Sequence, residues 1–284
     1  MKVSKADFSR MDSLVADASV CLFAAEDTAE LHDFDGRDHW FSPTVQRALA
    51  AILYWSAHSA MSELLRPWFE VALSRIINRV SRQDSETRYV AREKPWTRAG
   101  VMELFLSSLM QTRDFLQARG PLNGDATIEL ADTSLFIPLP DASVDLIITS
   151  PPYANSMDYY LYHKQRMNIL GYSFKKVQSL EIGSRWEFSS LKRGVDKWRN
   201  QYTTSLREFR RILKAEGRCV VIIGDSQIAG ELVDSASLTE TLGRSVGFRV
   251  SHIQSQPLEN RSRSFTRGFQ RPNKMEHTII LAPS

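Results

Sequence analysis

The fold can be inferred from one stretch of the sequence, Val144-Asp145-Leu146-Ile147-Ile148-Thr149-Ser150-Pro151-Pro152-Tyr153. Its apolar, β-branched first half predicts a buried strand of a parallel sheet. Pro151 and Pro152 end that strand and prevent an immediate helix, because proline lacks the backbone N–H that either structure needs. The chain must therefore turn rigidly at the carboxyl end of a strand. Open α/β sheets bind their ligands at such ends, and we expect the functional site here.

Around this stretch the sequence divides into two parts. Residues 1–120 carry apolar residues at helical spacing, and Ser42-Pro43 predicts a capped helix start. Pro67 should kink or restart one of these helices. In residues 121–284, short apolar segments alternate with helical patterns, which indicates a doubly wound α/β sheet. The expected strands are 127–131, 144–149, 219–223, 248–254 and 277–281.

The quoted turn, with the strand before it and residues 154–159 after it, resembles the Ser-Pro-Pro-Tyr signature of the DNA amino-methyltransferases. Those enzymes use S-adenosylmethionine to methylate the exocyclic amine of cytosine or adenine in DNA. The resemblance implies a Rossmann-like methyltransferase sheet. It also implies that the Ser150 side chain and the Pro151 carbonyl accept hydrogen bonds from the amine, that Pro152 stiffens the turn, and that Tyr153 stacks on a flipped-out base. A purely structural interpretation is a proline turn with a packed tyrosine.

Two further assignments follow from the resemblance. Serine rather than aspartate at position 150 resembles the cytosine branch more than the adenine branch, and both remain open. Asp132 matches the family's acidic residue near the cofactor, although a simple turn aspartate explains it equally well. We also assign Thr149, at the end of its strand, to the cofactor side.

The cysteines predict neither a metal site nor a covalent mechanism. Cys21 and Cys219 have no metal-ligand spacing, and neither follows a proline. The Pro-Cys nucleophile that ring-carbon methylation requires is therefore absent. Amine methylation needs no covalent intermediate.

The cofactor half of the family pattern is missing. The family holds its cofactor on a Gly-x-Gly turn after the first strand, and none of the 13 glycines here forms that pattern. We therefore expect residues 121–284 to be the catalytic half of a split enzyme that lacks the first two strands. Val144–Thr149 would be an edge strand with two uncovered faces, and a second polypeptide would supply the glycine turn. Two alternatives remain: a non-catalytic nucleic-acid-binding or regulatory relative, and a complete enzyme that uses the turn at Gly224.

Positive charge is concentrated in one insertion. Residues 159–218 hold 14 Lys and Arg against five Asp and Glu, in a chain with net charge +3. Such a block predicts a DNA-facing surface, although charged faces are often merely solvated. The residues assigned to DNA are Lys192, Arg193, Arg261, Arg263, Arg267 and Arg271.

No membrane span or signal-peptide core is evident, so we expect a cytoplasmic protein that acts in DNA modification. The recognition sequence and any association with a restriction nuclease are not encoded in a visible pattern.

Overall fold

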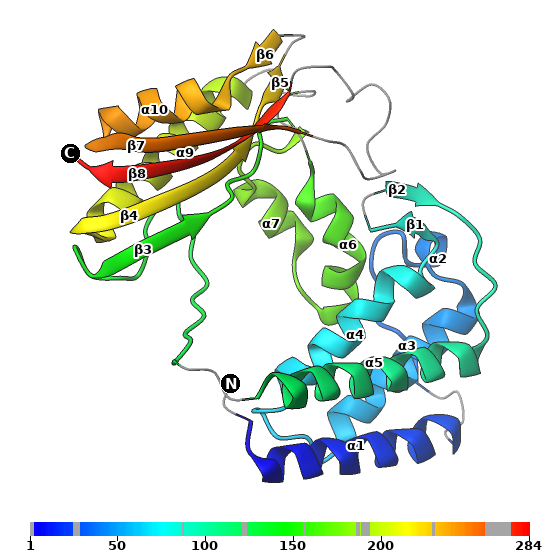
Figure 1. The fold of residues 1–284 in the computed structure, drawn as a ribbon. Coiled ribbons are helices and arrows are strands. Elements are labelled where there is room, and N and C mark those ends of the chain that lie inside the picture. Colours follow the sequence, from blue (N-terminus) through cyan, green and yellow to red (C-terminus); the bar gives the residue numbers. More distant parts are fainter. Residues whose placement is uncertain are drawn as a thin grey trace. The chain divides into compact units, whose positions relative to one another are not determined.

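The computed structural model describes residues 3–24, 29–86, 88–120, 124–155, 157–185, 188, 194–228, 231–258 and 274–284. The chain forms two compact units, each with its own hydrophobic core. The helical unit comprises Met1–Thr127 and Leu161–Phe174, and the sheet unit comprises Ile128–Tyr160 and Lys175–Ser284. We expected all of 121–284 to form one part, but Leu161–Phe174 packs with the N-terminal helices instead (Figure 1).

The helical unit is built from the amphipathic stripes of its sequence. Its first five helices are α1 (Lys5–Ala24), α2 (Arg37–Trp40), α3 (Pro43–His58), α4 (Arg66–Val80) and α5 (Arg98–Arg119). The apolar faces of α1, α3, α4 and α5 form one core, in which Leu49, Leu73 and Phe105 are fully buried. Sheet was not expected in this part, but a short hairpin of β1 (Gln83–Ser85) and β2 (Arg88–Ala91) follows α4.

Both proline signals of the helical unit are confirmed. Ser42 caps α3, since its side chain accepts a hydrogen bond from the Val45 amide at 3.4 Å, and Pro43 opens the helix. Pro67 lies in the first turn of α4, where its missing N–H costs nothing, so it starts the helix rather than kinking one.

The sheet unit follows the predicted α/β pattern. Its helices are α7 (Phe174–Leu180), α9 (Gly194–Ile212) and α10 (Ser235–Ser245), and α6 (Tyr159–Leu170) has its first two residues in this unit. Its strands are β3 (Val144–Thr149), β4 (Leu213–Gly224), β7 (Phe248–Pro257) and β8 (Met275–Pro283), with a separate hairpin of β5 (Ser226–Ile228) and β6 (Glu231–Val233).

The four main strands form one mixed sheet in the order β3-β4-β8-β7. β3 and β4 are parallel, and Thr149 pairs with Val221. β8 is antiparallel to both β4 and β7, which confirms the expected terminal antiparallel pair. Among the described residues β3 pairs on one side only, so the predicted edge strand is present and is not the buried strand that its apolar sequence suggested.

One face of this sheet is covered and the other is open. Cys219, Val221 and Leu281 are fully buried on the face that α9 and α10 contact (Figure 1). On the opposite face of β3, the side chains of Leu146 and Ile148 are 54% and 68% exposed. The expectation of two uncovered faces was therefore half wrong, because one face of β3 packs in the core.

The predicted strand 127–131 is absent. These residues have no regular secondary structure, and Ile128 and Leu130 are 96% and 101% exposed. A strand forms only where a neighbouring strand accepts its hydrogen bonds, and the described residues bring none to this segment. None of the helices in the described ranges is long and apolar enough to cross a membrane.

Candidate functional site

The proline turn presents the predicted polar atoms at the carboxyl end of β3. Ser150 follows the last residue of the strand and is exposed, whereas Pro151, Pro152 and Tyr153 are partly buried. The next residue, Ala154, is buried. The turn is thus anchored at its far end, and Ser150 remains exposed.

Tyr153 is held by residues of two other strands. Its hydroxyl donates a hydrogen bond of 2.9 Å to Oε1 of Glu276 on β8, and Gln256 on β7 donates to Oε2 of the same carboxylate at 3.0 Å. Burial, followed by the Glu276 carboxylate, raises the pKa of Tyr153 to about 12, so the phenol stays protonated and acts as a donor.

A glycine makes room for this ring. Gly224 ends β4, and a Cβ built on it would lie 2.6 Å from Cε2 of Tyr153. A real Cβ cannot approach an aromatic carbon so closely, so the missing side chain lets Tyr153 lie against the strand. This close approach accounts for the glycine that the sequence offered as an alternative cofactor turn.

Asn155 fixes the exit of the turn. It adopts a left-handed conformation with φ 54°, which asparagine tolerates better than most residues. Its backbone N–H donates to the Gly183 carbonyl at 3.1 Å, and its side-chain Nδ2 donates to the Gln227 carbonyl at 2.9 Å. These bonds tie the turn to the loop after α7 and to strand β5.

The two residues assigned to the cofactor differ in their local structure. Asp132 forms a local turn, because its Oδ1 accepts from the amide of Ser134 at 2.9 Å and from its hydroxyl at 2.7 Å. Its Oδ2 is not used in that turn. Thr149 is partly buried at the end of β3.

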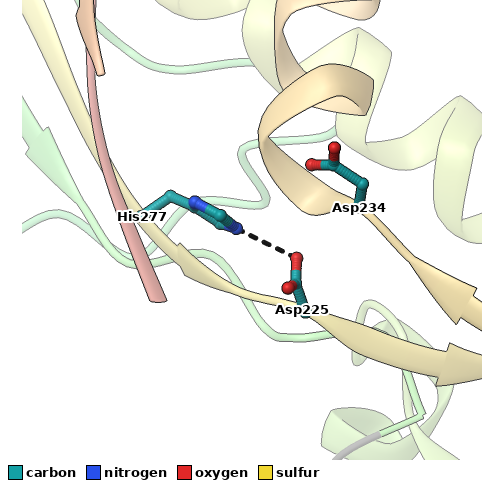
Figure 2. A group of neighbouring side chains, drawn as sticks. All are labelled: Asp225, Asp234 and His277. Carbon is teal, nitrogen blue, oxygen red and sulfur yellow. Dashed lines mark hydrogen bonds and ion pairs between the residues drawn. The ribbon is translucent and has the colours of Figure 1, made fainter. Parts of the chain in front are cut away.

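A second polar cluster lies beside the site and was not foreseen. Nε2 of His277 lies 3.0 Å from Oδ1 of Asp225 (Figure 2). Nδ1 of the same ring lies 2.8 Å from the Ser255 hydroxyl. Oδ2 of Asp225 accepts from the Met275 amide. Asp234 lies close by, but its carboxylate caps α10. All these groups already have partners within the chain, so the cluster joins the ends of β4 and β8 to the start of α10.

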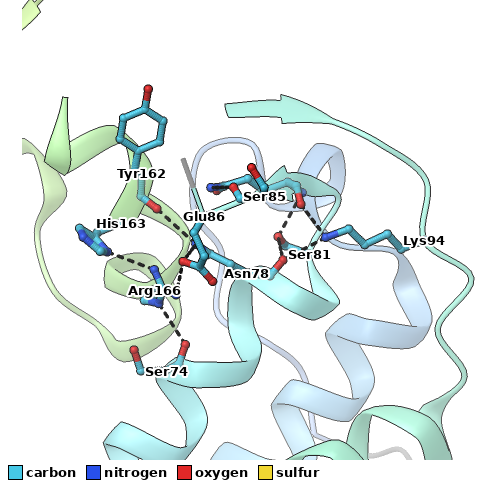
Figure 3. Close-up of polar contacts among 10 residues, drawn as sticks. Ser74, Asn78, Ser81, Ser85, Glu86, Lys94, Tyr162, His163 and Arg166 are labelled. Atoms are coloured by element: carbon cyan, nitrogen blue, oxygen red, sulfur yellow. Dashed lines mark hydrogen bonds and ion pairs between the residues drawn. The ribbon is translucent and has the colours of Figure 1, made fainter. Parts of the chain in front are cut away.

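Several of the basic residues in 159–218 point inward within the helical unit. Arg166 forms an ion pair with Glu86, donates to the Ser74 carbonyl at 3.0 Å and lies against His163 (Figure 3). Burial, and then the Arg166 charge, lower the pKa of His163. Lys164 pairs with Asp35 in the same unit at 3.5 Å. These cations stabilise the packing of α6 and are not available to DNA phosphates.

Other basic residues are paired in the sheet unit. Arg211 contacts Asp141 at 2.6 Å, and Lys214 contacts Asp145 at 2.8 Å. Arg199 and Arg207 are exposed on α9, two turns apart, and form no side-chain ion pair within the described residues. Fewer basic residues of 159–218 are therefore free to contact DNA than the charge count suggested.

All six residues assigned to DNA contact, Lys192, Arg193, Arg261, Arg263, Arg267 and Arg271, lie outside the described residues. Their assignment remains a prediction.

Sequence reasoning missed Gly224 as a packing partner, and it also missed Glu276, Asp225 and His277. Tyr153 and Glu276 are 123 positions apart, so no local pattern links them. The alternation of β8 supplied one signal: the consecutive residues Glu276 and His277 must face opposite sides of the sheet, and both are ionisable side chains in a strand that has no other ionisable residue.

Comparisons with known proteins give a limited result. No family model and no curated protein matches the chain. Among solved structures, the chain is similar to TTHA0409 of Thermus thermophilus, a presumed DNA modification methylase. Two crystal structures of that protein give 18% identity and TM-scores of 0.28 and 0.31, and a third, also 18% identical with a TM-score of 0.31, is a complex with S-adenosyl-L-methionine. The alignments cover 52–55% of this chain and 48–53% of TTHA0409, about half of each. Similarity at this level does not establish an activity, and we base the functional proposal on the residues of this chain.

Proposed function

We propose that this chain is a subunit of a site-specific DNA methyltransferase. It would direct a methyl group from S-adenosylmethionine to the exocyclic amine of a flipped-out cytosine, with adenine as the alternative target. One observation carries the proposal: Ser150-Pro151-Pro152-Tyr153 turns off the carboxyl end of a parallel strand, with Ser150 exposed.

The chemistry explains why these residue types would be needed. The exocyclic amine is a weak nucleophile, because its lone pair is delocalised into the base. Acceptors that take hydrogen bonds from the amine return electron density to nitrogen as the new bond forms. The Ser150 hydroxyl and the Pro151 carbonyl would be those acceptors, and the two prolines hold them in place before the base arrives. Tyr153 would stack on the base and replace part of the stacking lost on flipping.

The described residues do not complete a cofactor site by themselves. Asp132 retains Oδ2 for a ligand and Thr149 lies at the end of β3, so both could contact one end of a methyl donor. A donor site also needs the close backbone approach of a glycine turn. The one described glycine at the site, Gly224, is already covered by the ring of Tyr153.

The missing part would come from a second polypeptide. Among the described residues β3 has one unpaired edge, and Leu146 and Ile148 are exposed on the face opposite the helices. Ile128 and Leu130 expose the alternating pattern of a strand that lacks a neighbour. A partner strand beside β3 would pair this edge and bring its own glycine turn next to Pro151.

DNA would be held by exposed arginines of α9 and by the basic residues assigned from the sequence. Arg199 and Arg207 lie eight residues apart on α9, so they share one face of that helix. We assign phosphate contacts to them, together with Lys192 and Arg193 and the four arginines between 261 and 271. Neutral variants at these positions should weaken binding to all sequences alike and reduce its salt dependence.

Methylation by the chain co-expressed with its partner tests the proposal. We expect Ser150→Ala to slow methyl transfer by about 10²-fold, the cost of losing one positioned electrostatic partner, and to leave DNA affinity nearly unchanged. Ser143→Ala is the matched control, because Ser143 precedes the same strand and its hydroxyl bonds only the Pro140 carbonyl. Wild-type turnover in Ser150→Ala would refute the assignment. Stable DNA binding without any transfer by the wild-type complex would favour the non-catalytic relative. Cofactor binding and activity of the isolated chain would favour a complete enzyme.

A further inference from the structure

We propose that Glu276 and Gly224 are positioning residues that hold the ring of Tyr153 where a flipped base would stack. This inference rests on the proposed function and adds two residues to its site that no sequence motif identifies. It concerns the orientation of Tyr153, and neither residue is assigned a contact with the base.

The hydrogen bond fixes the direction in which the ring points. The tyrosine hydroxyl lies on the axis of the Cβ–Cγ bond, so a partner there restrains rotation about Cα–Cβ, and packing of the ring face against Gly224 restrains rotation about Cβ–Cγ. Glu276 provides that partner at 2.9 Å. Its carboxylate is itself held by Gln256 at 3.0 Å, so the acceptor does not follow the ring if it moves. The three side chains come from the proline turn and from two adjacent strands, β8 and β7.

The packing defines the ring's position along the sheet. Gly224 pairs with Glu276 across β4 and β8, so the residue that binds the hydroxyl and the residue that accommodates the ring lie side by side. Any side chain at position 224 would push the ring away from the carboxylate, because even a Cβ would lie 2.6 Å from Cε2 of Tyr153. One pair of facing residues thus controls both ends of the ring.

A Tyr153 ring that is already held in place should increase kcat. A base that stacks on a fixed ring does not need to immobilise it, and immobilising a side chain costs about as much as a three- to tenfold change in an equilibrium constant. The effect should appear in kcat, since it concerns the flipped state, more than in the KM for DNA.

The phenol itself reports on this arrangement without any catalysis. The full chain is labelled with fluorotyrosine, whose phenol titrates at lower pH than that of tyrosine, and is followed by ¹⁹F NMR. The signal of Tyr153 among the eight tyrosines is identified by its loss in Tyr153→Phe. Glu276→Gln keeps the shape and an acceptor oxygen but removes the negative charge, so we expect the pKa of Tyr153 to fall. Gly224→Ala should shift the same signal by displacing the ring.

A matched control and an activity arm complete the test. Glu216→Gln alters an exposed glutamate at the other end of β4 and should leave the Tyr153 signal and turnover unchanged. In the co-expressed complex, Glu276→Gln should lower kcat about three- to tenfold and leave the KM for DNA nearly unchanged. An unshifted Tyr153 pKa in Glu276→Gln would overturn the positioning role whatever the activity shows. A shifted pKa combined with wild-type turnover in Ser150→Ala would retain the Tyr153–Glu276 geometry and refute the methyltransferase proposal instead.

Discussion

Both units bury a core of apolar residues, but they differ in where apolar residues remain exposed. In the helical unit, the apolar stripes of four helices meet in one core, and Phe105 and Leu73 are fully buried. In the sheet unit, the covered face is equally well buried, but the opposite face and the β3 edge expose isoleucine and leucine side chains. Large apolar side chains are also exposed in the helical unit, Phe115 among them, so exposure alone does not separate the two units. What distinguishes the sheet unit is that its exposed Leu146 and Ile148 lie on a strand with one edge unpaired among the described residues, and such an edge favours pairing with another strand.

The largest expected effect tests the closed core. Phe105→Ala should lower the free energy of unfolding by about 3–5 kcal/mol, because the ring is fully buried and lies 5.8 Å from that of Phe69. Phe115→Ala on the same helix is the control: its ring is 64% exposed, and we expect a change within about 0.5 kcal/mol. Urea unfolding followed by helical circular dichroism measures both. Equal losses would contradict the assigned core.

The helical unit is also the part that the sequence predicted best. Helical periodicity, the Ser42 cap and the position of Pro67 are local signals, and each lies within a few residues of the element that it starts. The hairpin Gln83–Ala91 was missed because its residues are mostly polar and lack an alternating apolar pattern. Local chemistry is thus sufficient where contacts are local.

Local sequence signals predicted only part of the sheet unit. The apolar sequence segments predicted β3, β4, β7 and β8. Whether such a segment forms a strand also depends on a neighbouring strand: 127–131 has the pattern of a strand and forms none. The contacts at the site, Tyr153 with Glu276 and Asp225 with His277, join residues 123 and 52 positions apart. The proline turn was visible from the sequence, but the residues that hold it were not.

A second comparison contrasts two glycines in left-handed conformations, one in each unit. Gly171 has φ 78° with open space around its Cβ position, whereas Gly183 has φ 74° and its Cβ would lie 2.8 Å from Cδ1 of Trp198. Gly171→Ala should cost only the backbone strain, about 1–2 kcal/mol. Gly183→Ala should cost about 1–3 kcal/mol more, because Trp198 must move. Equal losses in thermal or urea unfolding would remove Trp198 from the argument.

The two helix caps should respond differently to acid. Hydrogen bonds from Ser237 hold the pKa of Asp234 below its ordinary value. A lowered folded-state pKa means that the cap stabilises fully above the unfolded pKa of about 3.9 and loses its effect as pH falls through the folded value. Ser42, which caps α3, does not titrate. Replacing either residue by alanine should cost about 0.5–2 kcal/mol at neutral pH.

Only the Asp234 contribution should vanish in acid. Urea unfolding from pH 7 to pH 2 of Asp234→Asn, which keeps a capping oxygen without a titrating charge, provides the control. The stability difference between this variant and the wild type should change below about pH 4. A difference that stays constant with pH would show that the carboxylate charge contributes nothing to the cap.

The smallest expected effect on stability is that of Ile148→Thr, which tests whether the second face of β3 is uncovered. Ile147 and Ile148 are neighbours on β3 that face opposite sides of the sheet, and Ile147 packs in the core whereas the Ile148 side chain is 68% exposed. Ile147→Thr should destabilise the isolated chain by about 0.5–3 kcal/mol. Ile148→Thr keeps the β-branched shape that suits a strand, and its effect on the free energy of unfolding should stay within about 0.5 kcal/mol.

The effect of Ile148→Thr should appear in self-association instead, because an unpaired apolar edge favours pairing with another chain. Sedimentation velocity of the isolated chain over a range of concentrations should show weaker self-association for Ile148→Thr than for the wild type. If Ile148→Thr destabilised the monomer as much as Ile147→Thr, the second face of β3 would already be covered by this chain, and the open side would not be a place for a partner.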